Sequence, residues 1–228
     1  TANVKLNQRI FEIEGVNHIF VYPNMGDGGC GTGAAVYHSW PGGVKDSISS
    51  AYFGPDYSER EIETALQAEG LEFTRPNNLA AEVAALIHSG EVVARFDGRM
   101  EYGPRALGNR SILYHASEPE VNQWLNNRLG RTEFMPFAPV TLYEAREKCY
   151  HGIRGAEHSA EFMTVTFDCT DFMRETCPAA VHVDGTARPQ LVRREVNPGY
   201  YDILKETEDT ISYAEHIDPK KKFSICGM

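Results

Sequence analysis

Apolar residues recur every three to four positions in four stretches of the chain, which is the spacing of an amphipathic helix. The four predicted helices cover residues 4–12, 59–69, 79–88 and 120–129. The second has clear ends, because Ser58-Glu59-Arg60-Glu61 has the pattern of a capping box and Gly70 is a typical helix stop. We interpret its many glutamates as a solvated face.

Short runs of β-branched or alternating residues lie between these helices and predict strands. The predicted strands cover residues 17–22, 91–97, 111–114, 140–142, 162–167 and 179–183. The last one is followed by the tight turn Asp184-Gly185 and continues over residues 186–192.

A break in this pattern starts at Pro41-Gly42-Gly43 and runs to about Pro55, and we predict a domain boundary there. The length of 228 residues allows one large domain or two small ones. Because the chain opens without a cap or start signal, we expect residue 1 to lie inside a larger domain.

Composition and charge narrow the classes of function. The formal net charge of −10 argues against a nucleic-acid-binding or anionic membrane-binding surface, since both need a basic face. The five cysteines show no Cys-x-x-Cys spacing, which makes a disulfide framework or a zinc site improbable. No apolar run reaches the length of a membrane span, and we expect a cytoplasmic protein that acts on small molecules.

The densest cluster of unusual residues is the segment Gly98 to Ser111, which we call the arginine loop. It holds three arginines, three glycines and one proline: Arg99, Arg105, Arg110, Gly98, Gly103, Gly108 and Pro104. Glycine lets a backbone approach a ligand closely, and arginine presents a fork of donors suited to phosphate or carboxylate. The segment therefore predicts an anion-binding loop. A surface turn in which the arginines pair with Glu101 and Asp97 is the alternative.

A second glycine-rich turn, at residues 25–35, follows a predicted strand and precedes small residues typical of a helix. Strand, glycine turn and helix is the arrangement of many phosphate-binding loops, in which backbone N–H groups face the ligand. Gly28 and Gly29 are the candidate contacts, and Asp27 is the only carboxylate in the turn. The alternative is that these glycines only allow close helix packing.

A third polar cluster follows residues 182–190. His182, Asp184, Thr186, Arg188 and Gln190 alternate in sequence, which predicts that they share one face of a strand. A solvent-facing polar strand is the alternative, but two arginine clusters that converge on one anion explain the pattern more economically. Nucleophile-elbow and zinc-protease motifs are absent from the sequence.

Three segments of the sequence together resemble the signatures of the NodU/CmcH-type O-carbamoyltransferases. They are Gly-Arg-Met-Glu-Tyr-Gly-Pro-Arg-Ala-Leu-Gly-Asn-Arg-Ser at 98–111, Pro-Phe-Ala-Pro at 136–139 and His-Val-Asp-Gly-Thr-Ala-Arg-Pro-Gln at 182–190. The resemblance runs from residue 1 to about Lys205. It implies an α/β (α+β) fold: a YrdC-like twisted mixed sheet with flanking helices over residues 51–228, preceded at 1–43 by the end of an actin-like ATPase domain.

The resemblance also implies a reaction. The YrdC-like domain would join the carbamoyl group of carbamoyl phosphate to ATP, with release of pyrophosphate, and the actin-like domain would pass it to a hydroxyl of a sugar or natural product. Such a step needs positioning and charge neutralisation rather than a protein nucleophile. We assign Arg105, Arg110 and Arg188 to the phosphates and His182 to orienting the carbamoyl group. Further predicted contacts are Arg99, Arg131, Thr186, Gly103, Gly28 and Gly29.

A divalent metal, iron or magnesium, is a further implication for the intact enzyme. In the family an aspartate in this Gly-Asp turn ligates the metal, with histidine partners from the preceding part of the enzyme, so Asp27 is the predicted ligand. Within this chain alone we expect Asp27 to cap the following helix instead.

Two departures from the family pattern bear on these expectations. Met135 and Leu129-Gly130 stand where many members have basic residues. After about Lys205 the family's last segment is replaced by a charged tail that contains Lys220-Lys221-Lys222. Two other functions stay open: a nucleotide or anion-binding module without turnover, and the formation of threonylcarbamoyl adenylate for tRNA modification.

Overall fold

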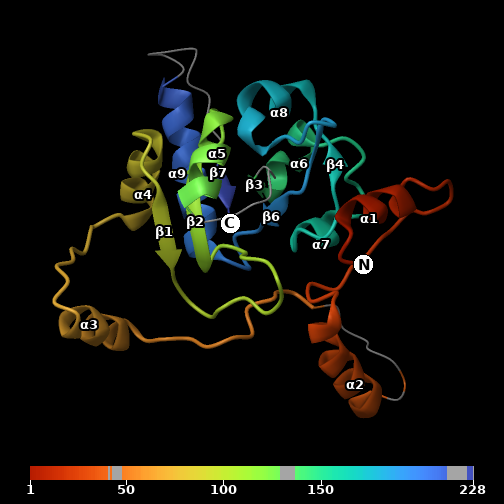
Figure 1. The fold of residues 1–228 in the computed structure, drawn as a ribbon, viewed down its shortest axis with the longest axis horizontal. Coiled ribbons are helices and arrows are strands. Elements are labelled where there is room, and N and C mark those ends of the chain that lie inside the picture. The colour runs from red at the N-terminus through yellow and green to blue at the C-terminus, as the bar shows by residue number, and fades with distance from the viewer. Residues whose placement is uncertain (41, 43–47, 129–136, 215–224, 228) are drawn as a thin grey trace.

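A computed structural model describes residues 1–40, 42, 48–128, 137–214 and 225–227. The chain folds into a mixed sheet, a smaller two-stranded sheet and surrounding helices (Figure 1). The helices are α1 (Val4–Phe11), α2 (Cys30–Ser39), α3 (Glu59–Ala68), α4 (Leu79–His88), α5 (Glu120–Arg128), α6 (Arg146–Cys149), α7 (Glu157–Ala160), α8 (Asp171–Thr176) and α9 (Pro198–Ala214). The strands are β1 (Val93–Phe96), β2 (Arg110–His115), β3 (Ala138–Leu142), β4 (Phe167–Asp168), β5 (Thr186–Ala187), β6 (Gln190–Val192) and β7 (Ile225–Gly227).

The larger sheet has the strand order β1-β2-β7-β3-β6. Neighbouring strands are antiparallel except for β3 and β6, which run parallel. Helices α4 and α9 lie side by side against this sheet in Figure 1. Their apolar side chains form one core with the sheet, in which Ile87, Leu113 and Tyr200 are fully buried. The arginine loop connects β1 to β2 and is therefore anchored at both ends in the sheet.

The smaller sheet, β4 and β5, forms a second core with α6 and α8. Tyr150, Ile153, Val165 and Met173 lie almost fully buried within it. Val21 from the N-terminal segment belongs to the same core. This buried cluster therefore contains residues from both sides of the predicted domain boundary.

Hydrogen bonds fix the N-terminal segment to the second core. The Asn7 side-chain amide donates to the carbonyl of Thr164 over 2.8 Å, and the backbone N–H of Val21 donates to Ser159 Oγ over 2.9 Å. Ser159 Oγ also donates to the carbonyl of Ile19 over 3.1 Å. Gly155, with φ of +93°, lets the chain pass so closely that an added Cβ would lie 2.1 Å from the Asn17 carbonyl oxygen.

The predicted helices are confirmed, and each begins within a residue or so of its expected start. Ser58 forms the predicted capping box with Glu61, and Asn78 caps α4. Within the described ranges, no helix is both long and apolar enough to cross a bilayer. The local signals of periodicity and capping were therefore sufficient for the helices.

Three predicted strands are wrong. Residues 17–22 form no strand, residues 162–167 contribute only Phe167 to β4, and residues 178–180 form a turn of 3₁₀ helix. In the second case the run is buried throughout, and its backbone amides bond to α7 and α1 rather than to a strand. The amide of Thr166, for example, donates to the Val4 carbonyl over 3.4 Å.

The tail holds a strand that the sequence did not predict. Residues 225–227, beyond the point where the family resemblance stops, form β7 between β2 and β3. The central position of this sheet is therefore filled from the chain's last described residues.

Candidate anion-binding site

Three glycines with positive φ shape the arginine loop: Gly98 at +52°, Gly103 at +120° and Gly108 at +111°. At Gly108 an added Cβ would lie 2.2 Å from the ring of Tyr200 in α9. At Gly103 it would lie 3.2 Å from the Pro23 carbonyl oxygen. Gly103 and Gly108, which we predicted to allow close approach of a ligand, instead allow close approach of neighbouring parts of the chain.

A carboxylate of the loop itself accepts hydrogen bonds from the loop's backbone N–H groups. Glu101 is only 7% exposed, and its Oε1 accepts N–H bonds from Leu107, Asn109 and Arg110 over 2.7, 2.8 and 3.2 Å. The remaining N–H of this stretch, from Gly108, donates to Ser111 Oγ over 2.9 Å. The loop does contain a backbone anion site, but Glu101 occupies it.

Three arginines around the loop donate mainly to backbone carbonyls. Arg95 donates to Gly108, Arg99 to Phe53 and Gly54, and Arg110 to Asp97, Gly98 and Asn109, over distances of 2.6 to 3.2 Å. Arg110 also stacks over the ring of Phe96, with 3.6 Å between its guanidinium carbon and the ring centroid. These contacts show how Arg99 and Arg110 shape the loop, while their predicted contact with phosphate is still a prediction.

Arg105 differs from its neighbours. It is half-buried, its Nε atom is buried, and it has no hydrogen-bond partner within the part of the chain that the structure describes. Burial lowers the pKa of its guanidinium, although arginine stays charged in proteins. A buried cation without an anion is costly. Arg105 is therefore the arginine of the loop best placed to take an external anion.

The 182–186 segment forms a tight turn rather than a flat strand. The Thr186 hydroxyl donates to Asp184 Oδ1 over 2.6 Å, and Lys5 Nζ from α1 lies 2.8 Å from Asp184 Oδ2. Hydrogen bonds from Lys5 and Thr186 hold the pKa of Asp184 well below its usual range. Burial lowers the pKa of His182. The negative charge of Asp184 opposes this shift, and the positive charge of Arg188 adds to it.

The prediction that residues 182–190 share one strand face is wrong. Thr186 lies in β5 of the smaller sheet, whereas Gln190 lies in β6 of the larger one. The chain changes sheets between them, at Arg188 and Pro189. Arg188 thus sits at the junction of the two sheets, where it is half-buried.

Gln190 joins this junction to the arginine loop. Its side-chain amide donates to the carbonyl of Leu107 over 2.7 Å, and the Tyr52 hydroxyl donates to the same oxygen over 2.7 Å. Asn197 bridges Tyr52 and Asn109 over 3.0 and 2.8 Å. Two segments more than 80 positions apart therefore meet at Leu107 and Gln190, which lie two residues after Arg105 and Arg188, respectively. This contact supports the predicted convergence of the two arginines, which stays a prediction.

A small pocket lies behind this contact, next to Tyr52, Leu107, Gln190 and Asn197. Gln190 is 3% exposed, and its Oε1 has no hydrogen-bond partner among the described residues. Burial raises the pKa of Tyr52 to about 12, which keeps its hydroxyl a donor. The lining also includes Glu161 and Arg193, which form an ion pair over 2.9 Å, and it includes no residue of the arginine loop other than Leu107.

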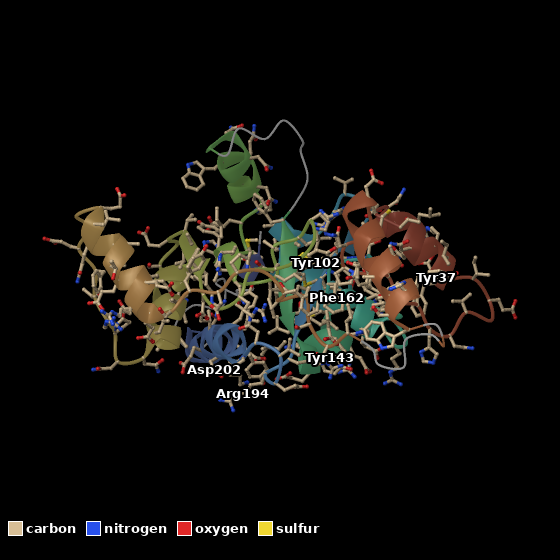
Figure 2. The ribbon with its side chains drawn as sticks, turned by 90° about the horizontal axis from the view of Figure 1, so that it is seen from below. Tyr37, Tyr102, Tyr143, Phe162, Arg194 and Asp202 are labelled. Carbon is tan, nitrogen blue, oxygen red and sulfur yellow. The ribbon has the colours of Figure 1, made fainter. Side chains whose placement is uncertain are left out.

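The second glycine turn packs against the arginine loop through Tyr102. The Tyr102 hydroxyl donates to the Gly28 carbonyl over 2.9 Å and lies 2.9 Å from the hydroxyl of Thr32. Figure 2 shows Tyr102 between the sheet and α2. An added Cβ at Gly29 would lie 2.0 Å from the Asn24 carbonyl oxygen, so this glycine serves a close turn.

Asp27 is exposed at the start of a 3₁₀ turn, and the expectation that it caps the following helix is wrong. The cap position of α2 is Gly29, and neither turn nor helix has a side-chain cap. Within the described ranges no three His, Cys, Asp or Glu side chains gather as metal ligands do. The described residues therefore do not form a metal site by themselves. Arg131, Met135 and Gly130 lie outside the described residues.

Comparison with known proteins identifies the family. The sequence profile described as "Carbamoyltransferase C-terminus" matches residues 84–215, which include the arginine loop and the 182–190 segment. This chain belongs to the carbamoyltransferase C-terminus family. The family resemblance predicted from the loop residues is thereby confirmed.

Longer curated proteins share this carbamoyltransferase segment. The chain is 34% identical to an uncharacterized protein, MJ1058, of Methanocaldococcus jannaschii over 93% of its own length and 36% of that protein. It is also 34% identical to the nodulation protein NolNO of Sinorhizobium fredii, over 89% of its length and 31% of that protein. The chain therefore spans about a third of these relatives. A solved structure titled as HypF of T. kodakarensis covers 69% of the chain at 14% identity with a TM-score of 0.41, too weak a similarity for any argument.

Sequence reasoning about this carbamoyltransferase segment missed the supporting residues. Glu101 appeared only as a possible surface partner for arginine, and Tyr52, Tyr102 and Asn197 did not stand out. One signal was available for Glu101, because a single carboxylate inside a loop rich in glycine is a typical acceptor for backbone N–H groups. Tyr52 and Asn197 carried no local signal, since their role depends on long-range contacts.

Proposed function

We propose that this chain is the part of an ATP-dependent O-carbamoyltransferase that forms carbamoyl adenylate from carbamoyl phosphate and ATP. The observation that carries the proposal is the family match over residues 84–215, which spans Arg105, His182 and Arg188. The unpartnered, half-buried Arg105 supports it independently, because both substrates are phosphate anions.

In the first step of the proposed reaction, water hydrolyses carbamoyl phosphate to carbamate and inorganic phosphate. A carbamate oxygen then bonds to the α-phosphorus of ATP, and pyrophosphate leaves. The protein's task is to hold two anions in line and to offset their charge. In this proposal Arg105 and Arg188 contact the phosphates, and His182 orients the carbamoyl group. Thr186 donates to Asp184 and thereby holds the turn that carries His182.

The acceptor step belongs to the longer protein. The proposed acceptor is a hydroxyl of a sugar or natural product, and the proposed partner is the remaining part of the same enzyme, with neither nucleic acid nor membrane involved. Residues 1–43 are proposed to belong to the transferring domain and residues 51–228 to the activating one. The role of Asp27 in binding iron or magnesium is likewise a proposal for the longer protein, and no step here depends on it.

Pyrophosphate release tests the proposal. The purified chain is incubated with ATP and carbamoyl phosphate, and pyrophosphate is measured against reactions that lack either substrate. Release that requires both substrates would support adenylate formation. Release only with threonine and bicarbonate would indicate tRNA-modification chemistry instead, and ATP binding without release would indicate a binding module.

A further inference from the structure

The arginine loop forms a ring of chain around Arg105, closed by Glu101. Glu101 precedes Arg105, and the three backbone N–H groups that its Oε1 accepts, from Leu107, Asn109 and Arg110, all follow it. The carboxylate is 7% exposed, so ligand and bulk solvent scarcely reach it. The segment that carries Arg105 is therefore fixed at both ends by one buried anion.

This arrangement decides which groups of the loop can meet a ligand. Backbone N–H groups gathered in a turn are a ready site for an external phosphate, but here they are already used by Glu101. Recognition of an anion by this loop then falls to a side chain. Arg105 is the arginine of the loop whose buried Nε has no partner among the residues described.

We propose that Glu101 is a positioning residue, which sets the anion affinity of the site by holding Arg105 in its binding geometry. The proposal rests on the function proposed above, and it assigns Glu101 no contact with substrate. A neutral amide at this position would accept weaker hydrogen bonds than a carboxylate, because charged acceptors bond about twice as strongly. The ring around Arg105 would then loosen without loss of side-chain volume.

Inorganic pyrophosphate is the probe for this proposal. Its dissociation constant is measured by calorimetry for the wild type and for E101Q, R105K and the double variant. We expect E101Q to bind pyrophosphate about tenfold more weakly. In the R105K background the same change should add less than about twofold, because both substitutions act on one contact. Glu91→Gln, which changes an exposed glutamate before β1, should leave the affinity unchanged.

Stability measurements separate positioning from folding. Unfolding in urea is followed for each variant, and Glu101→Asp serves where E101Q fails to fold. The aspartate keeps the charge but sits one methylene further back, so we expect a folded protein with weakened pyrophosphate binding. A loss that is additive with R105K, or tighter binding by E101Q, would overturn the proposal. Tighter binding would mean that Glu101 competes with the ligand for the N–H groups.

The two proposals fail in different ways. Pyrophosphate binding by the wild type, without release from ATP and carbamoyl phosphate, would defeat adenylate formation and leave the positioning role standing. If the wild type binds no pyrophosphate at all, the positioning proposal is overturned.

Discussion

The arginines of this protein divide by what their donors already bind. Arg95, Arg99 and Arg110 donate to carbonyl oxygens and hold the loop together, whereas the buried Nε of Arg105 has no partner within the described ranges. Sequence alone could not make this distinction, because all four arginines lie in or next to the same glycine-rich segment. A guanidinium becomes available for a ligand only when the fold leaves its donors without carbonyls.

Arg105→Lys should weaken pyrophosphate binding by about 10- to 100-fold. Lysine keeps the charge but loses the planar fork, and a hydrogen bond to a charged group contributes about 1.5–3 kcal/mol. Calorimetric titration measures the effect. Arg194→Lys is the matched control, since Arg194 pairs with Asp202 at an exposed position elsewhere (Figure 2). Equal affinities of the two variants would contradict the assignment of Arg105.

His182 should make stability sensitive to acid. Burial lowers its folded pKa below the ordinary value of about 6.5, so the unfolded chain binds the proton first as the pH falls. Stability is unaffected by this group above about pH 6.5 and decreases from there down to the folded pKa. His182→Gln should remove that part of the loss. Urea unfolding at about pH 7.5 and about pH 5.5 tests this, and a wild-type to variant difference that is equal at both pH values would count against it.

At the scale of elements, helices were predictable and several strands were not. The capping residues Ser58 and Asn78 act within one helical turn, so sequence alone contains the information. The buried run at 162–166 looked like a strand because its residues alternate, but it bonds to α7 and α1. Register and pairing depend on segments more than 150 positions away. The loop and the arginine cluster were found from the sequence for the opposite reason, since their signal is composition rather than contact.

Glycine positions give a matched pair of tests at this scale. Gly108→Ala should destabilise the protein by about 2–4 kcal/mol, because φ is +111° and the new Cβ would overlap the Tyr200 ring. Gly31→Ala in α2 meets no atom within 4 Å and should stabilise that helix by up to about 1 kcal/mol. Both are measured by urea unfolding. A Gly108→Ala variant as stable as the wild type would contradict the close contact between Gly108 and Tyr200.

At the scale of the whole molecule, the N-terminal segment and residues 150–187 share one core. Val21 contributes to it, and α1 bonds to the buried run through Asn7. The predicted boundary between residues 43 and 51 stays a prediction, but these contacts cross it. Sequence could not reveal them, because the break at Pro41-Gly42-Gly43 reports only on local chain geometry.

Ser159→Ala tests the connection between the two segments. The Ser159 hydroxyl is fully buried and accepts from the Val21 amide while it donates to the Ile19 carbonyl. Its removal leaves two backbone groups unpaired and should cost about 1–3 kcal/mol in the free energy of unfolding. Ser89→Ala, which removes an exposed hydroxyl at the end of α4, is the control and should change little. Similar effects of the two changes would mean that the segment is held by other contacts.

The shared core also has a consequence for recombinant work on this family. The family match begins at residue 84, whereas the side chains that pack against the second core begin with Phe11 in α1. A protein trimmed to the profile would lose Phe11, Ile19 and Val21 from this core, and apolar surface that is exposed in this way promotes aggregation. A form that lacks only residues 1–24 keeps α4 whole, so its insoluble expression would indicate the loss of this part of the core. A synthetic peptide of residues 1–24, added during refolding, should restore solubility by taking its place in trans.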